Sequence, residues 1–218
     1  LGAACRDVHA VLDHAQEALP LLREAYAKAE TPAERLSYAH VLGILGDPAG
    51  VETLLAAIKE PPKETVQLHW SERMGRRMSD ADSYTVALGR TRDKRALAPL
   101  LEQVRELDAS SPFFHVRVLT LALEVLGDPA AAQPLAELLQ KPGVGGYAMT
   151  AVGEIAAYGY GNGTERNLAL RELGLARALY RCGDFQGVAE KVLRQYALDL
   201  RGVYALHATA VLKSGKKE

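Results

Sequence analysis

The sequence is poor in cysteine and tryptophan, with two cysteines and one tryptophan among its 218 residues. Cys5 and Cys182 lie far apart and form no CxxC pair, which argues against a zinc site or a disulfide scaffold and favours a reducing compartment. The sequence also lacks any apolar run near the ~20 residues that a membrane-spanning helix needs. Its richest run, residues 118–123, is followed at once by Glu124. We therefore expect a soluble, cytoplasmic protein with no membrane partner.

An excess of charge of either sign is also absent. The chain has 26 lysines and arginines against 27 aspartates and glutamates, for a net charge of −1. This balance provides no overall positive field that would attract nucleic acid or anionic lipid, so a nucleic-acid partner is disfavoured. Hydrophobic residues make up 48% of the chain, which is enough to bury a substantial core.

Catalytic and metal-binding motifs are missing. The six histidines are scattered and form no HExxH pair. Residues 159–163 are rich in glycine, but they lack the GxGxxG and GxxxxGK[ST] spacings of phosphate-binding loops. Cys182 stands in an apolar helical pattern, so we interpret it as a buried core residue rather than a nucleophile. We predict no catalytic residue, no metal ligand and no cofactor-binding residue in this chain.

What the chain does contain is a repeated turn. Residues 45–48 read Leu-Gly-Asp-Pro, residues 126–129 read the same, and residues 182–185 read Cys-Gly-Asp-Phe. Glycine can end a helix in the left-handed conformation, aspartate can cap the next helix, and proline suits the first turn of that helix. The turn aspartates are Asp47, Asp93, Asp128 and Asp184. Because their position explains them as caps, they are weak candidates for acid–base catalysis.

Apolar residues at helical spacing flank each turn and predict helical hairpins. Thr31 opens a Thr-Pro-x-Glu helix start, and its helix should continue to about residue 45. The helix that follows should end at the two prolines of residues 61–62. Ser111, which precedes a proline, is expected to cap a later hairpin, and residues 204–212 should form a closing helix. The predicted fold class is all-α.

We predict that one domain covers residues 1–218 and that its repeats are interrupted by two insertions. The predicted parts are an N-terminal cap or partial repeat at 1–30, three repeats at 31–140 with an insertion at 63–79, a glycine-rich insertion at 142–164, and a C-terminal repeat with a capping helix at 165–213. Insertions into repeat proteins map to loops and often lie on the binding side.

The first insertion holds the candidate partner-binding residues. They are Trp70, Arg73, Arg76 and Arg77, to which we add Arg90. Residues 69–95 carry seven basic side chains against four acidic ones, and tryptophan beside arginine is typical of protein-binding hot spots. Two alternatives are that Trp70 packs within the insertion among solvated arginines, or that the cluster contacts nucleic acid.

The hairpins, with their Leu-Gly-Asp-Pro turns and Leu-Leu pairs, resemble HEAT-like repeats of the phycobilisome-lyase type. The resemblance covers most of the chain and implies an α-solenoid with a concave surface that usually binds protein. More narrowly, residues 74–79, 87–91 and 172–181 resemble the HEAT-like C-terminal region of bacterial FAD-dependent oxidoreductases. That resemblance implies that a flavin domain precedes residue 1 and that FAD binds there; the first residue, which is not methionine, agrees with such a truncation.

The predicted function is a non-catalytic protein–protein interaction or scaffold module, in the C-terminal region of a larger bacterial FAD-dependent oxidoreductase. Its partner would be another protein or another domain of the same polypeptide. The alternative is a HEAT-like DNA-binding protein or DNA-repair glycosylase, which would need a basic groove that the composition disfavours. Phycobilin lyase activity is a third possibility, for which no catalytic residue can be named.

Overall fold

The computed structural model describes residues 14–59, 78–157 and 163–215. The regular secondary structure of these residues is entirely helical, which confirms the all-α prediction. None of the helices in these ranges is long and apolar enough to cross a membrane. The chain divides into two compact units, Leu1–Ala96 and Leu97–Glu218. The prediction that one repeat domain covers the whole chain stays a prediction.

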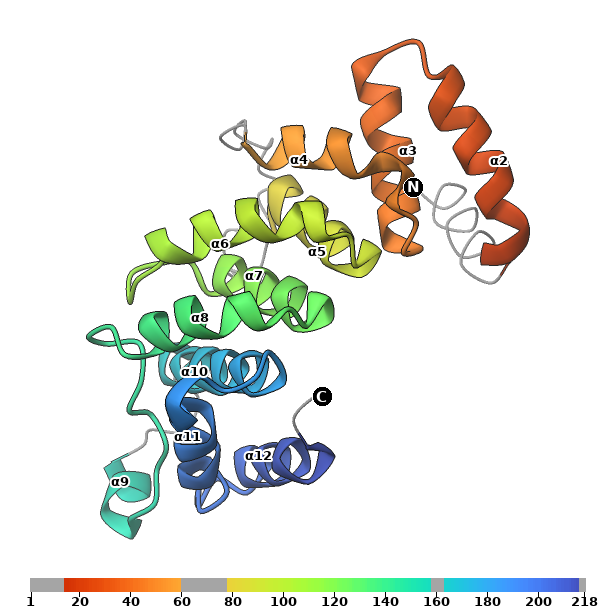
Figure 1. Cartoon of the computed structure of the whole chain (residues 1–218). Helices are drawn as coiled ribbons and strands as arrows, with labels where there is room; N and C mark the ends of the chain where they lie inside the picture. The colour runs from red at the N-terminus through yellow and green to blue at the C-terminus, as the bar shows by residue number, and fades with distance from the viewer. Residues whose placement is uncertain (1–13, 60–77, 158–162, 216–218) are drawn as a thin grey trace. The chain divides into compact units, whose positions relative to one another are not determined.

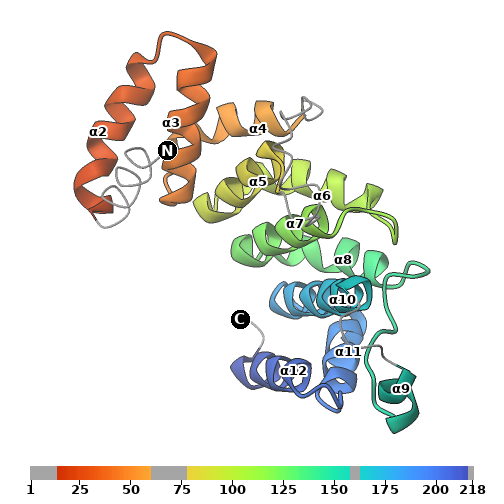
Figure 2. The same cartoon turned by 180° about the vertical axis from the view of Figure 1, so that it is seen from behind.

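In the first unit, α3 begins at the capped start that the sequence predicts. The elements of this unit are α2 (Ala15–Lys28), α3 (Pro32–Ile44), η1 (Pro48–Gly50), α4 (Val51–Lys59), α5 (Asp80–Thr91) and η2 (Lys94–Ala96). The Glu34 backbone N–H donates to the Thr31 hydroxyl at 3.2 Å, and the Glu34 carboxylate accepts from the Thr31 backbone N–H. Helix α2 lies beside α3 in both views of Figures 1 and 2. Gly43 lets α3 approach α5 closely, because a Cβ there would lie 2.9 Å from that of Ala87.

The repeated turns are built as predicted. Gly46 and Gly127 adopt positive φ values of 84° and 63°, which end α3 and α7 (Phe113–Leu126). The carboxylates of Asp47 and Asp128 each accept the N–H two residues ahead, at 2.9 and 3.0 Å. Such caps are typically worth ~1 kcal/mol. The Asp47 carboxylate also binds Arg23, a side chain of α2.

Two turns differ in detail from the expectation. Asp184 does not cap the adjacent residues: its own φ is 53°, and its carboxylate accepts the Ala189 N–H at 2.7 Å. The prediction that Ser111 caps the next helix is wrong. Its hydroxyl instead accepts the Asp108 N–H at 2.9 Å, and α7 begins after Pro112 with no side-chain cap. The Asp108 carboxylate accepts hydrogen bonds from the hydroxyls of both Ser110 and Ser111. Ser111 is therefore held by Asp108 and does not cap α7.

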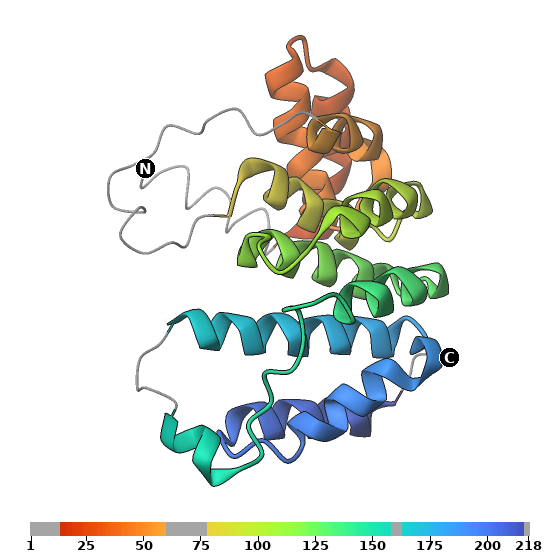
Figure 3. The same ribbon diagram turned by 90° about the vertical axis from the view of Figure 1, so that its left-hand side faces the viewer.

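The second unit is organised around α10. Its elements are α6 (Leu97–Glu106), α7, η3 (Pro129–Ala131), α8 (Ala132–Leu139), α9 (Val152–Ala157), α10 (Gly163–Arg181), η4 (Phe185–Gly187), α11 (Val188–Tyr196) and α12 (Val203–Ser214). Figure 3 shows α10 with α7 and α8 on one side and α11 and α12 on the other. Leu123 of α7, together with Leu175 and Leu179 of α10, is fully or almost fully buried, and so is Cys182, as predicted.

Residues 142–157 of the second insertion are attached to α10 and to the turn before α12, whereas its last two residues, 163–164, belong to α10 itself. The Glu172 carboxylate, 2% exposed as a residue, accepts the N–H groups of Gly146 and Tyr147 at 2.8 Å each and the Tyr196 hydroxyl at 2.8 Å. The buried Asp199 carboxylate accepts the Met149 N–H at 2.9 Å. Figure 3 shows the segment crossing α10 on its way to α9.

Replacing Leu123 with alanine tests the core. Leu123 is 0% exposed, so we expect Leu123→Ala to lower the free energy of unfolding by roughly 2–5 kcal/mol. Urea unfolding followed by circular dichroism measures the change. The matched control is Leu206→Ala on α12, where the side chain is 75% exposed. A loss below about 0.5 kcal/mol at Leu123, the range of an ordinary surface substitution, would contradict the packing described.

Replacing Glu172 with glutamine tests the attachment of residues 142–157. The change removes the charge that accepts three hydrogen bonds, and hydrogen bonds to charged groups are worth about 1.5–3 kcal/mol each. Because glutamine keeps one acceptor oxygen, we expect an overall loss of about 3 kcal/mol and faster amide exchange at Gly146 and Tyr147. Glu137→Gln, at an exposed site of α8, is the control. Unchanged exchange at the two amides would contradict the role of Glu172.

Candidate functional site

The residues that the sequence suggested for partner binding are not brought together in the described part of the chain. Trp70, Arg73, Arg76 and Arg77 lie outside the described residues. Arg90 is exposed in the last turn of α5, and no hydrogen bond or ion pair joins its side chain to another described residue. The partner-binding cluster therefore stays a prediction.

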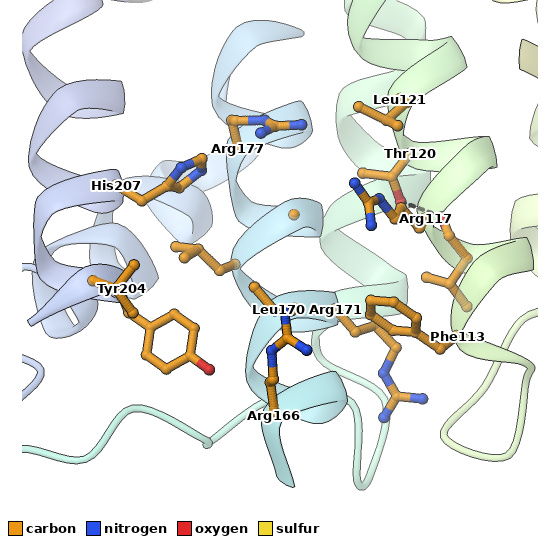
Figure 4. A pocket seen from close by; sticks show the side chains of 14 residues that line it. Phe113, Arg117, Thr120, Leu121, Arg166, Leu170, Arg171, Arg177, Tyr204 and His207 are labelled. Carbon is orange, nitrogen blue, oxygen red and sulfur yellow. Dashed lines mark hydrogen bonds between the residues drawn. The ribbon is translucent and has the colours of Figure 1, made fainter. Parts of the chain in front are cut away.

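The second unit contains a pocket that the sequence did not suggest. Its volume is about 420 Å³, and its lining comes from one face each of α7, α10 and α12 (Figure 4). The lining residues recur at helical spacing, as expected for one face of each helix. Gly174 of α10 helps to keep the pocket open, because a Cβ at that position would meet no atom within 4 Å.

Basic side chains dominate the polar lining. They are Arg117 of α7, Arg166, Arg171 and Arg177 of α10, and His207 of α12. No aspartate or glutamate is among the described residues that line the pocket. A partly enclosed space with several guanidinium groups and low-dielectric walls favours an anionic occupant. We call this space the arginine pocket.

Arg117 and Arg166 are the exposed cations of the arginine pocket. Neither guanidinium has a hydrogen bond or ion pair with any residue in the described ranges. They lie on different helices, and Arg117 follows Phe113 by one turn of α7. Figure 4 shows Arg166 between Phe113 and Tyr204. We call this part of the pocket, formed by Phe113, Arg117 and Arg166, the Arg166 end.

Arg171 has a structural role. The residue is 6% exposed, and its two terminal nitrogens donate to the carbonyls of Ala109 at 2.8 Å and Gly143 at 2.9 Å. It thereby joins the loop before α7 to the loop after α8. Its buried Nε has no hydrogen-bond partner in the described structure. The positive charge of Arg171 therefore adds to the field of the pocket while its side chain stays fixed.

The other end of the pocket contains a partly neutralised arginine. Arg177 Nε donates to Glu124 Oε2 at 2.8 Å, and Arg181 Nη1 lies 2.9 Å from Glu124 Oε1. The Glu124 side chain belongs to α7 and is only 9% exposed. This carboxylate thus compensates one of the two guanidinium charges. We call the part lined by Arg177 and His207 the Glu124 end, after the carboxylate that pairs with Arg177 and is not itself part of the lining.

His207 faces the Glu124 end as a neutral side chain at pH 7. Burial lowers the pKa of His207, and the charges of Arg177 and Arg181 lower it further against the opposing effect of Glu124. Protonated histidine would place another cation beside these arginines. Leu170 and Tyr204 also line the pocket and provide apolar and aromatic surface. The pocket therefore combines cationic and uncharged recognition surface.

The first unit contains one histidine–hydroxyl contact, which lacks the third member of a nucleophilic triad among the described residues. His40 Nε2 lies 3.4 Å from the Ser83 hydroxyl in the first unit, and the His40 ring packs edge-on against Tyr84 at 5.1 Å. No carboxylate among the described residues hydrogen-bonds the other ring nitrogen, as a nucleophilic triad requires. No group of three or more His, Cys, Asp or Glu residues in the described ranges could hold a metal ion.

Sequence analysis missed the arginine pocket because its residues come from three helices far apart in the chain. One signal was present in the apolar helix that became α7. Apart from His115, Arg117 and Glu124 are its only ionisable residues, and they stand seven positions apart, on one face of a helix. A polar pair at this spacing in an apolar helix indicates a buried or half-buried polar partner on a neighbouring element.

The lowered pKa of His207 has a consequence for stability. The ordinary pKa of histidine is 6.5. As the pH falls below that value, His207 binds a proton more readily in the unfolded chain than in the folded chain, so the free energy of unfolding decreases as the pH is lowered. His40, whose pKa burial also lowers, acts in the same direction. We expect His207→Gln to reduce the loss of melting temperature between pH 7 and pH 5, as measured by thermal unfolding.

The carboxylates Asp93 and Asp108 do not affect the comparison of melting temperatures between pH 7 and pH 5. Hydrogen bonds from Arg95 lower the pKa of Asp93, and hydrogen bonds from Ser110 lower that of Asp108. Their contributions are present above the ordinary pKa of 3.8 and are lost only at lower pH. His14→Gln, at an exposed position, controls for the substitution itself. An equal loss in the His207 variant and the parent protein would contradict the burial of a neutral His207.

Comparison of this chain with family models, with curated proteins and with solved structures gives no match. The arginine pocket itself has two exposed guanidinium groups at one end, a guanidinium paired with a carboxylate at the other, and apolar surface in its lining.

Proposed function

We propose that the chain is a non-catalytic protein-interaction module that binds an acidic segment of its partner in the arginine pocket. The observation that carries this proposal is the lining of the pocket, which has four arginines and, among the described residues, no acidic side chain. The partner is another protein or another domain of the same polypeptide. The scaffold is a HEAT-like α-solenoid in this proposal, which the recurring helix–Gly-Asp–helix turns support.

An acidic segment suits the chemistry of the pocket. A carboxylate is planar and can accept two parallel hydrogen bonds from one guanidinium, which gives arginine both affinity and geometric specificity for it. Arg117 and Arg166 are exposed to solvent before binding, so each would contribute modestly alone. The buried Arg171 and the half-buried Arg177 add to their attraction for an anion, because water screens a buried or partly buried charge less than an exposed one.

In the wider setting of this proposal, the module is the C-terminal region of a bacterial FAD-dependent oxidoreductase in the cytoplasm. FAD would bind in the preceding domain, and the acidic segment could belong to that domain. Support comes from the residue patterns at 74–79, 87–91 and 172–181, and from the burial of Cys182, which suits a reducing compartment. Expression of the module with its upstream reading frame, followed by flavin absorbance, tests this setting.

DNA binding or DNA-repair glycosylase activity is the alternative. It would require basic residues that follow a duplex backbone over many phosphates. In the described second helices of the hairpins, α4 has Lys59, α6 has Arg105, α8 has no lysine or arginine, and α11 has Lys191 and Arg194. This distribution supports the protein partner instead. Binding of duplex DNA at physiological salt, with a steep salt dependence, would favour the alternative.

The double variant Arg117→Gln/Arg166→Gln tests the acidic partner. The probe is a short peptide with blocked termini that contains alternating glutamate and phenylalanine, and binding is followed by NMR shifts of the second unit. Loss of two charge-assisted contacts should weaken binding by about tenfold or more. The same peptide with glutamine in place of glutamate should not bind measurably to the parent protein.

Two single variants serve as matched controls. Arg194→Gln removes an exposed arginine of α11 that pairs with Glu190 outside the pocket, and it should leave the affinity unchanged. Arg90→Gln tests the cluster suggested by the sequence. If Arg90→Gln weakens binding and the double variant does not, the binding surface is that cluster and the assignment to the arginine pocket is wrong.

A further inference from the structure

We infer that the arginine pocket has a second anion position, formed at the Glu124 end by Arg177 and His207, so that its occupant is an acidic segment with two carboxylates. One carboxylate binds at the Arg166 end, and the other binds at the Glu124 end. This inference rests on the proposed function, whose partner class it narrows. Its basis is that Glu124 fixes Arg177 through one nitrogen and leaves the other two nitrogens free.

Arg177 keeps most of its hydrogen-bond donors free while its position is fixed. Its Nε donates to Glu124 Oε2 at 2.8 Å, which uses one of the five N–H groups of a guanidinium. The two terminal nitrogens of Arg177 have no hydrogen-bond partner among the described residues, and Arg177 lines the pocket (Figure 4). These nitrogens can therefore donate two parallel hydrogen bonds to a carboxylate of the occupant.

The charge at the Glu124 end also favours an anion. Arg177 and Arg181 share the single carboxylate of Glu124, so two positive charges and one negative charge leave a net charge of +1. His207, which lines this end, has a lowered pKa because of its burial and the charges of the two arginines. A neutral imidazole still has one N–H donor. An anion at this end therefore meets a positive charge and donors from two helices.

The two anion positions are too far apart for a single carboxylate. Arg166 and Arg177 are eleven positions apart on α10, which corresponds to about 16 Å along the helix axis. On α7, Arg117 and Glu124 are seven positions apart, which corresponds to about 10 Å. Arg177 cannot turn toward the Arg166 end without breaking its ion pair with Glu124. Two carboxylates roughly 10–16 Å apart are therefore needed to occupy both ends.

One face of α10 joins the two ends. Arg166, Leu170, Gly174 and Arg177 follow one another at intervals of four, four and three positions, and all four line the pocket. The stretch between the two arginines is uncharged, and a Cβ at Gly174 would meet no atom within 4 Å. Alternate side chains of an extended peptide lie on the same side, and residues four positions apart are separated by about 13 Å. Two glutamates at this spacing with an apolar side chain midway therefore match the pocket.

The experiment compares the blocked peptide Glu-Ala-Phe-Ala-Glu with the two peptides in which one of its glutamates is replaced by glutamine. Titrations of the parent protein at pH 7.5 are followed by NMR. We expect the peptide with two glutamates to bind about tenfold more tightly than either peptide with one, as for one added charge-assisted contact. It should also shift the ring signals of His207 and leave those of His40 in the first unit unchanged.

The variants Arg177→Gln and Arg181→Gln separate a direct contact from long-range attraction. Each removes one positive charge next to Glu124 and leaves Glu124 with one arginine partner. Of the two arginines, Arg177 is the one that lines the pocket. We therefore expect Arg177→Gln to abolish the gain from the second glutamate and Arg181→Gln to retain most of it. Circular dichroism checks that both variants are folded.

Two results would overturn the inference. One is a parent protein that binds the peptide with two glutamates within about twofold of the better peptide with one. That measurement needs no variant and stands even if Arg177→Gln fails to fold. The other is an equal loss of the gain in the folded Arg177→Gln and Arg181→Gln variants. In that case the second glutamate is attracted by the overall charge of the pocket and has no position of its own.

The same titrations separate this inference from the proposed function. If the peptides with one glutamate bind, Arg117→Gln/Arg166→Gln weakens them and the second glutamate adds nothing, the proposed function stands and the second anion position fails. If none of the three peptides binds the parent protein, both proposals fail. If the gain is present and depends on Arg177, both proposals are supported.

Discussion

A charged side chain that is removed from water must find partners, and α10 carries two such side chains in succession. Arg171 and Glu172 are 6% and 2% exposed, and both form hydrogen bonds with residues outside α10. Arg171 binds the carbonyls of Ala109 and Gly143, whereas Glu172 binds the N–H groups of Gly146 and Tyr147. The segment after α8 is thus bound by both side chains. Arg171 donates to one of its carbonyl oxygens, and Glu172 accepts from two of its N–H groups. The course of residues 142–147 depends on this pair, and Arg171 also lines the arginine pocket.

Other charged side chains of the second unit are paired to different degrees. Glu124 is nearly buried and shared by two arginines, while Asp199 is buried and bound by Arg201 at 2.9 Å and by the Met149 N–H. Arg117 and Arg166 alone among the pocket arginines are exposed and have no partner within the described chain. The contrast separates arginines that hold the fold together from those whose entire guanidinium group is available to a ligand. Charge by itself would not make that distinction, because all four pocket arginines carry the same charge.

Local structure was readable from the sequence because its determinants are local. The Thr31 capping box, the left-handed Gly46 and the Asp47 cap each involve residues within a few positions of one another. Cys182 was placed in the core by its position in a helical stripe. The same reasoning failed at Ser111, where a second local acceptor and donor, Asp108, captured the side chain. The arginine pocket was not readable, because the pairing of Glu124 with Arg177 and Arg181 depends on how α7 packs against α10.

Gly174 connects the stability of the second unit with the space that its pocket provides. A glycine in the interior of a helix is less favourable than alanine by roughly 0.5–1 kcal/mol, and α10 is the longest helix described. Since a Cβ at Gly174 would meet no atom within 4 Å, alanine would fit there, strengthen the helix and take up part of the pocket. Selection for thermal stability alone would therefore tend to close the pocket. A ligand in the pocket would make the apolar contacts that a side chain at position 174 would otherwise make, and would stabilise α10 in its place. Position 174 therefore serves either ligand binding or the thermal stability of the free chain.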